Sequence, residues 1–262
     1  MKKLTIYQVD AFTSKIFSGN PAAVCILDHW IDDALMQSIA NENNLSETAF
    51  AVPAQDRYEI RWFTPEVEVE LCGHATLATA HVLFNHMGHS PDRIDFDTVF
   101  SGRLSVEKSG ELLTLDFPTD TLEEMVVPEV IVTALRKAPL KALKGKTDFM
   151  FIYASQSEIE EMEPDFGLLA QMGGRGVIVT AMGNDADFVS RFFAPQTGIN
   201  EDPVTGSAHT SLIPYWSRVL GRKKLNTRQL SRRGGDLVCE DKGDRVRISG
   251  HAVTYLVGEI TI

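Results

Sequence analysis

The chain contains an internal repeat, and this repeat limits the folds that the chain can adopt. The segment "SGRLSVEKSGELLTL" (101–115) resembles "GGDLVCEDKGDRVRI" (234–248), with glycines, leucines and a glutamate matched at a constant spacing of 133 positions. The same spacing relates Gly88 to Gly221. Matches that keep one spacing and one order indicate two similar halves.

The repeat extends upstream into two glycine-containing loops. At the spacing of 133, Gly73 of "ELCGHATLATA" corresponds to Gly206 of "EDPVTGSAHTSL". Further upstream, "RWFTP" (61–65) matches "RFFAP" (191–195) at a spacing of 130. We infer a three-residue insertion in the second copy, between the matched aromatic segment and the matched glycine.

The repeat divides the 262 residues into two domains of ordinary size. We predict an N-terminal domain at 1–118 and a C-terminal domain at 130–252, joined by a linker at 119–129 that is bounded by prolines. The last strand, 253–262, could join the N-terminal domain.

Each half is predicted to have a central helix, at 74–87 in the first half and at 207–220 in the second. A glycine directly follows each helix and ends it in the left-handed conformation, and Pro214 could kink the second helix. A further helix at 32–43 is capped by Asp32. Short strands flank these helices, and in the first half they lie at 5–12, 22–27, 47–53 and 58–63.

The first central helix is apolar nearly all round, as a buried helix is. We therefore predict an α+β fold with two pseudo-symmetric domains, each a mostly antiparallel sheet curled around a central helix.

Composition excludes several classes of protein. The formal charge is −11, and the basic stretch 221–235 is more simply a solvated turn and strand edge than an anion site, so we expect no nucleic-acid partner. No apolar run is long enough for a membrane span or a signal peptide. Three widely spaced cysteines indicate no disulfide framework, and we expect a cytoplasmic protein.

The two repeated helix starts are candidate anion sites, because helix N-termini carry free N–H groups and partial positive charge. If both starts face one cleft, they could hold a carboxylate-bearing substrate near Gly73 and Gly206. The titratable candidates beside them are His74 and Asp202, and Glu47 opens an uncharged strand. Composition alone favours Glu47 as an exposed residue at the start of a strand.

A metal site is not predicted. His81, His86 and His89 are too irregularly spaced on a helix ending near Gly88 to form one ligand face.

Several motifs together resemble one known family over essentially the whole chain. "FSGNPAAV", "NLSETAF", "FTPEVEVELCGHATLA", "LDFP", "FAPQTGINEDPVTGSAH" and "ISGHAV" are similar to segments of the PhzF family, the phenazine-biosynthesis-protein-like isomerases. The resemblance implies the fold of diaminopimelate epimerase, with an active site between two domains. It also implies an isomerase that moves a proton without metal or cofactor, and a homodimer.

The resemblance also assigns residues to roles. The family's catalytic groups match Glu47, His74 and Asp202, with Glu47 as the general acid and base. The substrate-binding positions match Asn20, Ser46, Gly73, Gly206 and Ser207. The expected reaction is a proton or double-bond shift on a small, cyclic or unsaturated carboxylic acid.

Two alternatives remain open. An amino-acid racemase or epimerase of this fold uses two opposed thiols, but only Cys72 lies at such a position, and the second loop has no cysteine. Cys72 is therefore interpreted as a packing residue. A non-catalytic member that binds a small ligand or a protein is the other alternative.

Overall fold

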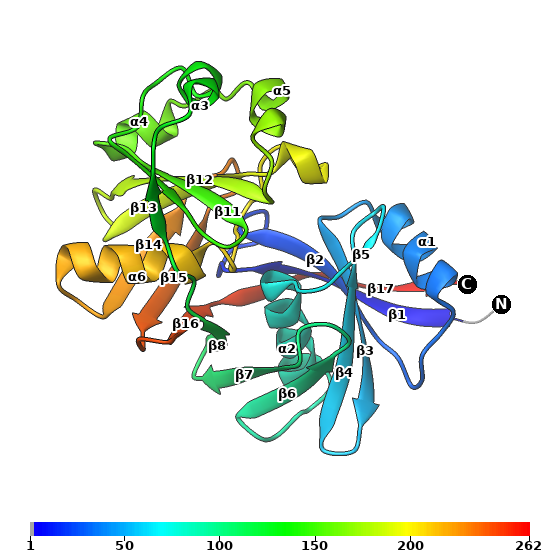
Figure 1. Ribbon diagram of the computed structural model, residues 1–262. Helices are drawn as coiled ribbons and strands as arrows, with labels where there is room; N and C mark the ends of the chain where they lie inside the picture. The colour runs from blue at the N-terminus through cyan, green and yellow to red at the C-terminus, as the bar shows by residue number, and fades with distance from the viewer. Residues whose placement is uncertain (1–2) are drawn as a thin grey trace. The chain divides into compact units, whose positions relative to one another are not determined.

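The structure is a computed structural model that describes residues 3–262 (Figure 1). The fold is α+β and consists mainly of strands. The chain divides into two compact units, one formed by Met1–Asp116 with Ile248–Ile262 and the other by Phe117–Arg247. Both boundaries fall inside strands, β8 (Leu112–Pro118) and β16 (Arg245–Gly250).

In the first unit, a largely antiparallel sheet has the order β8–β7–β6–β4–β3–β2–β1–β17, and a short strand β5 pairs with β4. Only the β2–β3 and β4–β6 pairs are parallel within that order. The strands other than β8 are β1 (Lys3–Ala11), β2 (Asn20–Ile26), β3 (Glu47–Ala54), β4 (Arg57–Phe63), β5 (Glu68–Val69), β6 (Arg93–Thr98), β7 (Arg103–Ser109) and β17 (Ala252–Thr261).

The central helix of this unit is α2 (Gly73–His86), which contacts β1, β2, β3, β7 and β17. Every residue from 73 to 80 is buried, so the prediction of a helix buried on all sides is confirmed. Gly88 follows with a φ of 68°, and the N–H of His89 bonds to the carbonyl of Leu83 at 3.0 Å. The predicted left-handed terminator is therefore present.

Helix α1 (Asp33–Asn43) lies between β2 and β3 in the chain. The Asp32 carboxylate accepts a hydrogen bond from the N–H of Ala34 at 2.9 Å, which confirms the predicted N-cap.

The second unit repeats the pairing pattern of the first. Strands β10, β11, β12, β13, β14 and β15 pair in chain order, and β11–β12 and β13–β14 are the parallel pairs, as β2–β3 and β4–β6 are. The elements before β16 are β9 (Glu123–Met125), α3 (Glu129–Ala134), β10 (Lys141–Lys144), β11 (Asp148–Ile152), α4 (Gln156–Glu160), α5 (Phe166–Leu169), β12 (Gly176–Met182), β13 (Phe188–Phe193), α6 (His209–Leu220), β14 (Lys224–Gln229) and β15 (Gly235–Asp241). Two 3₁₀ turns, Ala170–Met172 and Pro195–Thr197, complete the unit.

Helix α6 begins at His209 rather than at the predicted Ser207, because the preceding turn is closed by 3₁₀-type hydrogen bonds, which span three residues instead of four. The N–H of His209 bonds to the carbonyl of Gly206, and the N–H of Thr210 bonds to that of Ser207. The helix continues through Pro214 and ends at Gly221, whose φ is 65°.

A matched pair of ion pairs locates the insertion between the two copies. Arg61 donates hydrogen bonds to both carboxylate oxygens of Glu68, and Arg191 donates in the same way to both carboxylate oxygens of Glu201. The arginines are 130 positions apart and the glutamates 133, so the extra residues lie between Arg191 and Glu201, where the chain forms the 3₁₀ turn Pro195–Thr197.

The segment 119–129, predicted as a linker, belongs to the second unit. Strand β9 pairs antiparallel with β10, and the N–H of Thr119 bonds to the carbonyl of Asp244 at 2.9 Å. The prolines that suggested a linker lie at the ends of elements, Pro118 as the last residue of β8 and Pro128 as the N-cap of α3. Residues 248–252, which we assigned to the second domain, belong to the first unit.

The basic stretch 221–235 forms a turn and β14, with its lysines and arginines mostly at the surface. Arg222 pairs with Asp187, and Arg228 pairs with Asp236 at 2.7 Å. The interpretation as a solvated face holds, but β14 is not an edge strand, because β13 and β15 flank it.

Candidate active site

Glu47 is the first residue of β3 and lies in parallel register with Ala22 of β2. Its side chain is 13% exposed, so the alternative of a solvent-exposed strand-start residue is wrong. Ser46 directly precedes it and is half-buried. The strand that follows is buried from Thr48 to Val52, and Glu47 therefore stands at the edge of an apolar region.

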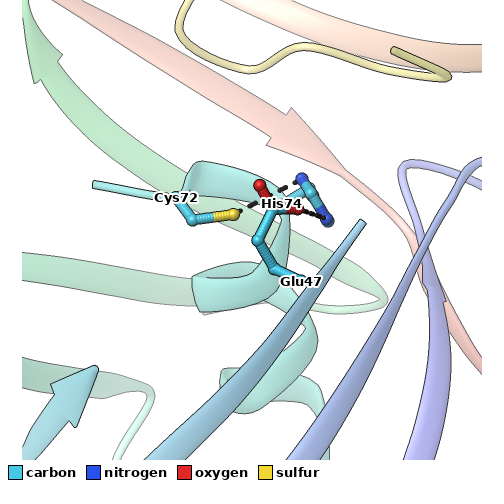
Figure 2. Close-up of side chains that lie close together, drawn as sticks. All are labelled: Glu47, Cys72 and His74. Carbon is cyan, nitrogen blue, oxygen red and sulfur yellow. Dashed lines mark hydrogen bonds and ion pairs between the residues drawn. The ribbon is translucent and has the colours of Figure 1, made fainter. Parts of the chain in front are cut away.

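His74 lies in the first turn of α2 and is 5% exposed. Its Nε2 is 3.1 Å from Oε2 of Glu47 (Figure 2). Its Nδ1 is 3.1 Å from Nδ2 of Asn20, which opens β2 and is fully buried. The structure thus brings three of the predicted site residues, Asn20, Glu47 and His74, into direct contact.

The turn before Asn20 depends on a glycine. Gly19 has a φ of 67°, and a Cβ on it would lie 2.2 Å from the carbonyl oxygen of Ala11. No other residue fits this backbone without displacement. The "GNP" motif therefore has a structural cause, which is to bring Asn20 into β2 beside His74.

The charge state of His74 follows from its neighbours. Burial alone would lower the pKa of His74, but Cys72 and Glu47 raise it, and the pKa lies well above the usual value for histidine. The carboxyl group of Glu47 thus favours the protonated form of His74, whose Nε2 lies 3.1 Å from it.

Cys72 is the member of this cluster that the sequence analysis interpreted as a packing residue. Its Sγ lies 3.5 Å from Nδ1 of His74 (Figure 2), so it is more than a packing residue. Burial raises the pKa of Cys72 to about 11, Glu47 raises it further and His74 lowers it. At neutral pH the side chain is a thiol rather than a thiolate.

Glu47, Cys72 and His74 also have the right atom types for a metal, with ligand atoms within 4.8 Å of one another. However, Cys72 approaches Nδ1 of the imidazole and Glu47 approaches Nε2. A histidine binds one metal ion through one ring nitrogen, and tetrahedral zinc ligands lie roughly 3.5 Å apart. The observed arrangement therefore fits separate close contacts to the two ring nitrogens better than a shared ion.

Three further histidines lie on α2 or shortly after it. Nε2 of His81 and Nε2 of His86 both contact Oγ1 of Thr254, at 3.0 and 2.8 Å. Nε2 of His89 instead contacts the carbonyl of Arg93 at 3.1 Å. Two of the three imidazoles therefore share a partner, and the third points to a different one.

In the second unit, the predicted residues Asp202, Gly206 and Ser207 lie in the loop before α6. Thr205 donates a hydrogen bond to Oδ2 of Asp202 at 2.5 Å. Nε2 of the fully buried Gln229 donates to the carbonyl oxygen of Asp202 at 2.8 Å. The loop is therefore held in a defined conformation by β14.

Ser207 is oriented by a charged residue that the sequence analysis also missed. Nη1 of Arg175 donates to Oγ of Ser207 at 2.8 Å, and Arg175 forms an ion pair with the buried Asp148. Since the Ser207 oxygen accepts from Arg175, its own hydrogen is available for another acceptor. Arg175 lies 32 residues from Ser207 in the chain, and no local pattern marks it.

The environment of His209, in the first turn of α6, predicts how the stability of the protein depends on pH, which can be measured without a substrate. It is fully buried, Nδ1 bonds to the carbonyl of Thr205, and Nε2 has no hydrogen-bond partner among residues 3–262. Burial lowers the pKa of His209 to about 4, an effect that the Thr205 carbonyl partly offsets. Because the unfolded chain binds the proton more tightly, stability should fall by about 3 kcal/mol as pH drops from 6.5 to 4.

Denaturant unfolding at a series of pH values measures this dependence. In His209→Asn the slope between pH 4 and 6.5 should decrease by the contribution of one proton. A slope that is the same in His209→Asn and the wild type would contradict the assignment.

Comparison with known proteins is decisive for the family. The family described as "Phenazine biosynthesis-like protein" matches residues 9–258. The chain belongs to this family. It is 49% identical over 258 residues to an uncharacterized isomerase of Pseudomonas aeruginosa, covering 98% of this chain and 99% of the relative.

Solved structures agree with this family membership. A phenazine biosynthesis protein of the PhzF family from Enterococcus faecalis has 46% identity and a TM-score of 0.97, with 100% of both chains covered. A hydroxyproline epimerase from Agrobacterium vitis has 10% identity and a TM-score of 0.63, covering 98% of this chain and 92% of the epimerase, which shows a shared fold. The PhzF-like protein has, within its described residues, no helix that is long and apolar enough to cross a membrane.

Proposed function

We propose that this PhzF-like protein is an isomerase that transfers a proton, without a cofactor, within a small unsaturated or cyclic carboxylic acid. The observation that carries the proposal is the contact between Glu47, at the start of β3, and the buried His74, at the start of α2, whose side chains are 3.1 Å apart. A carboxylate and an imidazole in contact supply a base and an acid in one place.

In the proposed reaction, Glu47 takes a proton from a carbon atom next to an unsaturated group. The electrons shift along the double bond, and the proton returns to a carbon atom further along. His74 donates a hydrogen bond or a proton to a polar substituent. Substrate and product are isomers, so the reaction needs no oxidant or second substrate.

The N-terminus of α2 favours negative charge that develops on the substrate. The first N–H groups of a helix have no partner within the helix, and the Cys72 side chain makes no capping hydrogen bond to them. The backbone N–H of Gly73 is one of these groups, and it can stabilise an enolate-like oxygen. This is also the reason for proposing an anionic substrate.

Asp202, Gly206 and Ser207 belong to the proposal through the family resemblance. Thr205 and Gln229 orient Asp202, and Arg175 orients Ser207. Such hydrogen-bonded positioning is the arrangement that a binding role for these side chains requires.

The racemase alternative is weakened by the second copy of the helix start. Cys72 corresponds to Thr205 at the spacing of 133, and the Thr205 hydroxyl is engaged with Asp202. Two-base racemisation by thiols needs a second cysteine at that position.

A screen of small cyclic and unsaturated carboxylic acids in heavy water tests the proposal. Wild-type protein should incorporate deuterium into one of these acids and form its isomer, and Glu47→Gln should not. If wild type and Glu47→Gln incorporate the same amount of label, or if no acid is labelled, the proposal is wrong. The protein would then be assigned to the non-catalytic class.

A further inference from the structure

Helix α2 has an unusual residue at its N-cap. Cys72 occupies this position with a φ of −141° and a ψ of 106°, whereas serine, threonine, aspartate and asparagine are preferred there. The carbonyl of Cys72 accepts from the N–H and the hydroxyl of Thr76, at 3.1 and 2.6 Å. The backbone thus starts the helix in the usual way, and the Cys72 side chain makes no capping hydrogen bond, although the nearby backbone N–H of Ala75 lowers the pKa of the thiol slightly.

The sulfur instead faces the imidazole. Sγ of Cys72 is 3.5 Å from Nδ1 of His74, and Glu47 contacts the other ring nitrogen, Nε2, at 3.1 Å (Figure 2). Asn20 contacts the same Nδ1 at 3.1 Å. Within the first unit, the ionisable groups that act on His74 are therefore Cys72, next to its own helix, and Glu47, on β3.

A thiol suits this position because it favours the protonated form of the ring. When His74 carries protons on both nitrogens, Nδ1–H needs an acceptor, and the sulfur supplies one. When the ring is neutral and Nδ1 is bare, the amide of Asn20 at 3.1 Å can donate to it without help from the sulfur. Alanine or valine in place of Cys72 could not accept from Nδ1–H.

We propose that Cys72 is a positioning residue of the active site, which acts through His74 by holding the imidazole against Glu47 and supporting its proton-donating form. The inference deepens the proposed function and rests on it for its catalytic meaning. Cys72 keeps its proton and contributes only a hydrogen bond to Nδ1, so no bond of the thiol is made or broken.

The chain offers a matched control in Cys25. This cysteine lies in β2 of the same unit, is fully buried and packs in an apolar cluster with residues such as Phe50 and Met36. Burial raises the pKa of Cys25 to about 12, and no other group contributes to this rise. Replacing Cys25 tests the effect of losing a buried thiol, without loss of a contact to His74.

The test is an NMR titration of the His74 ring, assigned with His74→Gln, in the wild type, Cys72→Val, Cys72→Ser and Cys25→Val. Valine has nearly the volume of cysteine but cannot form its hydrogen bond. If Cys72→Val does not fold, Cys72→Ala is used in its place. The His74 midpoint should fall by about 0.5–1 pH unit in Cys72→Val, the equivalent of one hydrogen bond. Serine should restore it, and Cys25→Val should not change it.

An unchanged His74 midpoint in Cys72→Val would overturn the proposal, as would an equal decrease in Cys25→Val. The titration needs no substrate, so its outcome is independent of the heavy-water screen. Once a substrate is known, Cys72→Val should also move the alkaline limb of the kcat/KM profile to lower pH. A lower kcat/KM whose alkaline limb stays at the wild-type pH would show a purely structural role and would reject the positioning role.

Discussion

Replacing Glu47 by Gln should reduce the isomerisation rate by about 100- to 10,000-fold, since general acid–base groups contribute about that much. This corresponds to a barrier higher by about 3–5 kcal/mol. Glutamine keeps the size of the side chain but cannot take a proton from carbon. The measurement is kcat/KM, together with deuterium incorporation, on the acid identified in heavy water.

Glu111→Gln is a matched control for this substitution. Glu111 lies in the exposed turn between β7 and β8 of the same unit, and its replacement should leave kcat/KM unchanged. Glu47→Gln should also lower the pKa of His74, because the carboxylate is one of the two neighbours that raise it. A Glu47→Gln protein with wild-type kcat/KM would remove Glu47 from the mechanism.

Gly19→Ala should destabilise the protein by about 2–6 kcal/mol. A non-glycine residue at a φ of 67° costs about 1–3 kcal/mol, and forcing a group into occupied space adds a similar amount. Here the new Cβ would meet the carbonyl oxygen of Ala11 at 2.2 Å and a methyl group of Thr13 at 2.6 Å. Denaturant unfolding monitored by circular dichroism measures the change.

The variant Gly110→Ala separates the cost of the positive φ from the cost of the close contact. Gly110 has a φ of 60°, but no atom lies within 4 Å of a Cβ built on it. This variant should therefore lose only the conformational part, about 1–3 kcal/mol. Equal losses in the two variants would show that the close approach to Ala11 contributes nothing.

Local patterns were sufficient for much of the fold. Helix α2 was predictable because its residues are apolar on all sides, and its end because a glycine follows. Helix α1 was predictable from its Asp32 cap. The repeat indicated matching topologies, which the strand pairing of the two units shows. The proposed homodimer and cytoplasmic location remain predictions.

Local patterns failed where partners are distant in the chain. The segment 119–129 looked like a linker because of its prolines, yet the pairing of β9 with β10 places it in the second unit. The first turn of α6 was predicted two residues early, because sequence does not distinguish a 3₁₀ turn from an α-helical one.

For the site, the sequence by itself determined which groups are available: the carboxylate of Glu47, the imidazole of His74 and the amide of Asn20 stand in recognisable motifs. Only the tertiary structure decided that they touch, because the register of β2 against β3 and the placement of α2 over both strands bring positions 20, 47 and 74 together. The contact of Cys72 with His74 is local, because the two residues lie two positions apart at the start of α2. Its meaning nevertheless depends on the tertiary structure, which places Glu47 and Asn20 against the same imidazole.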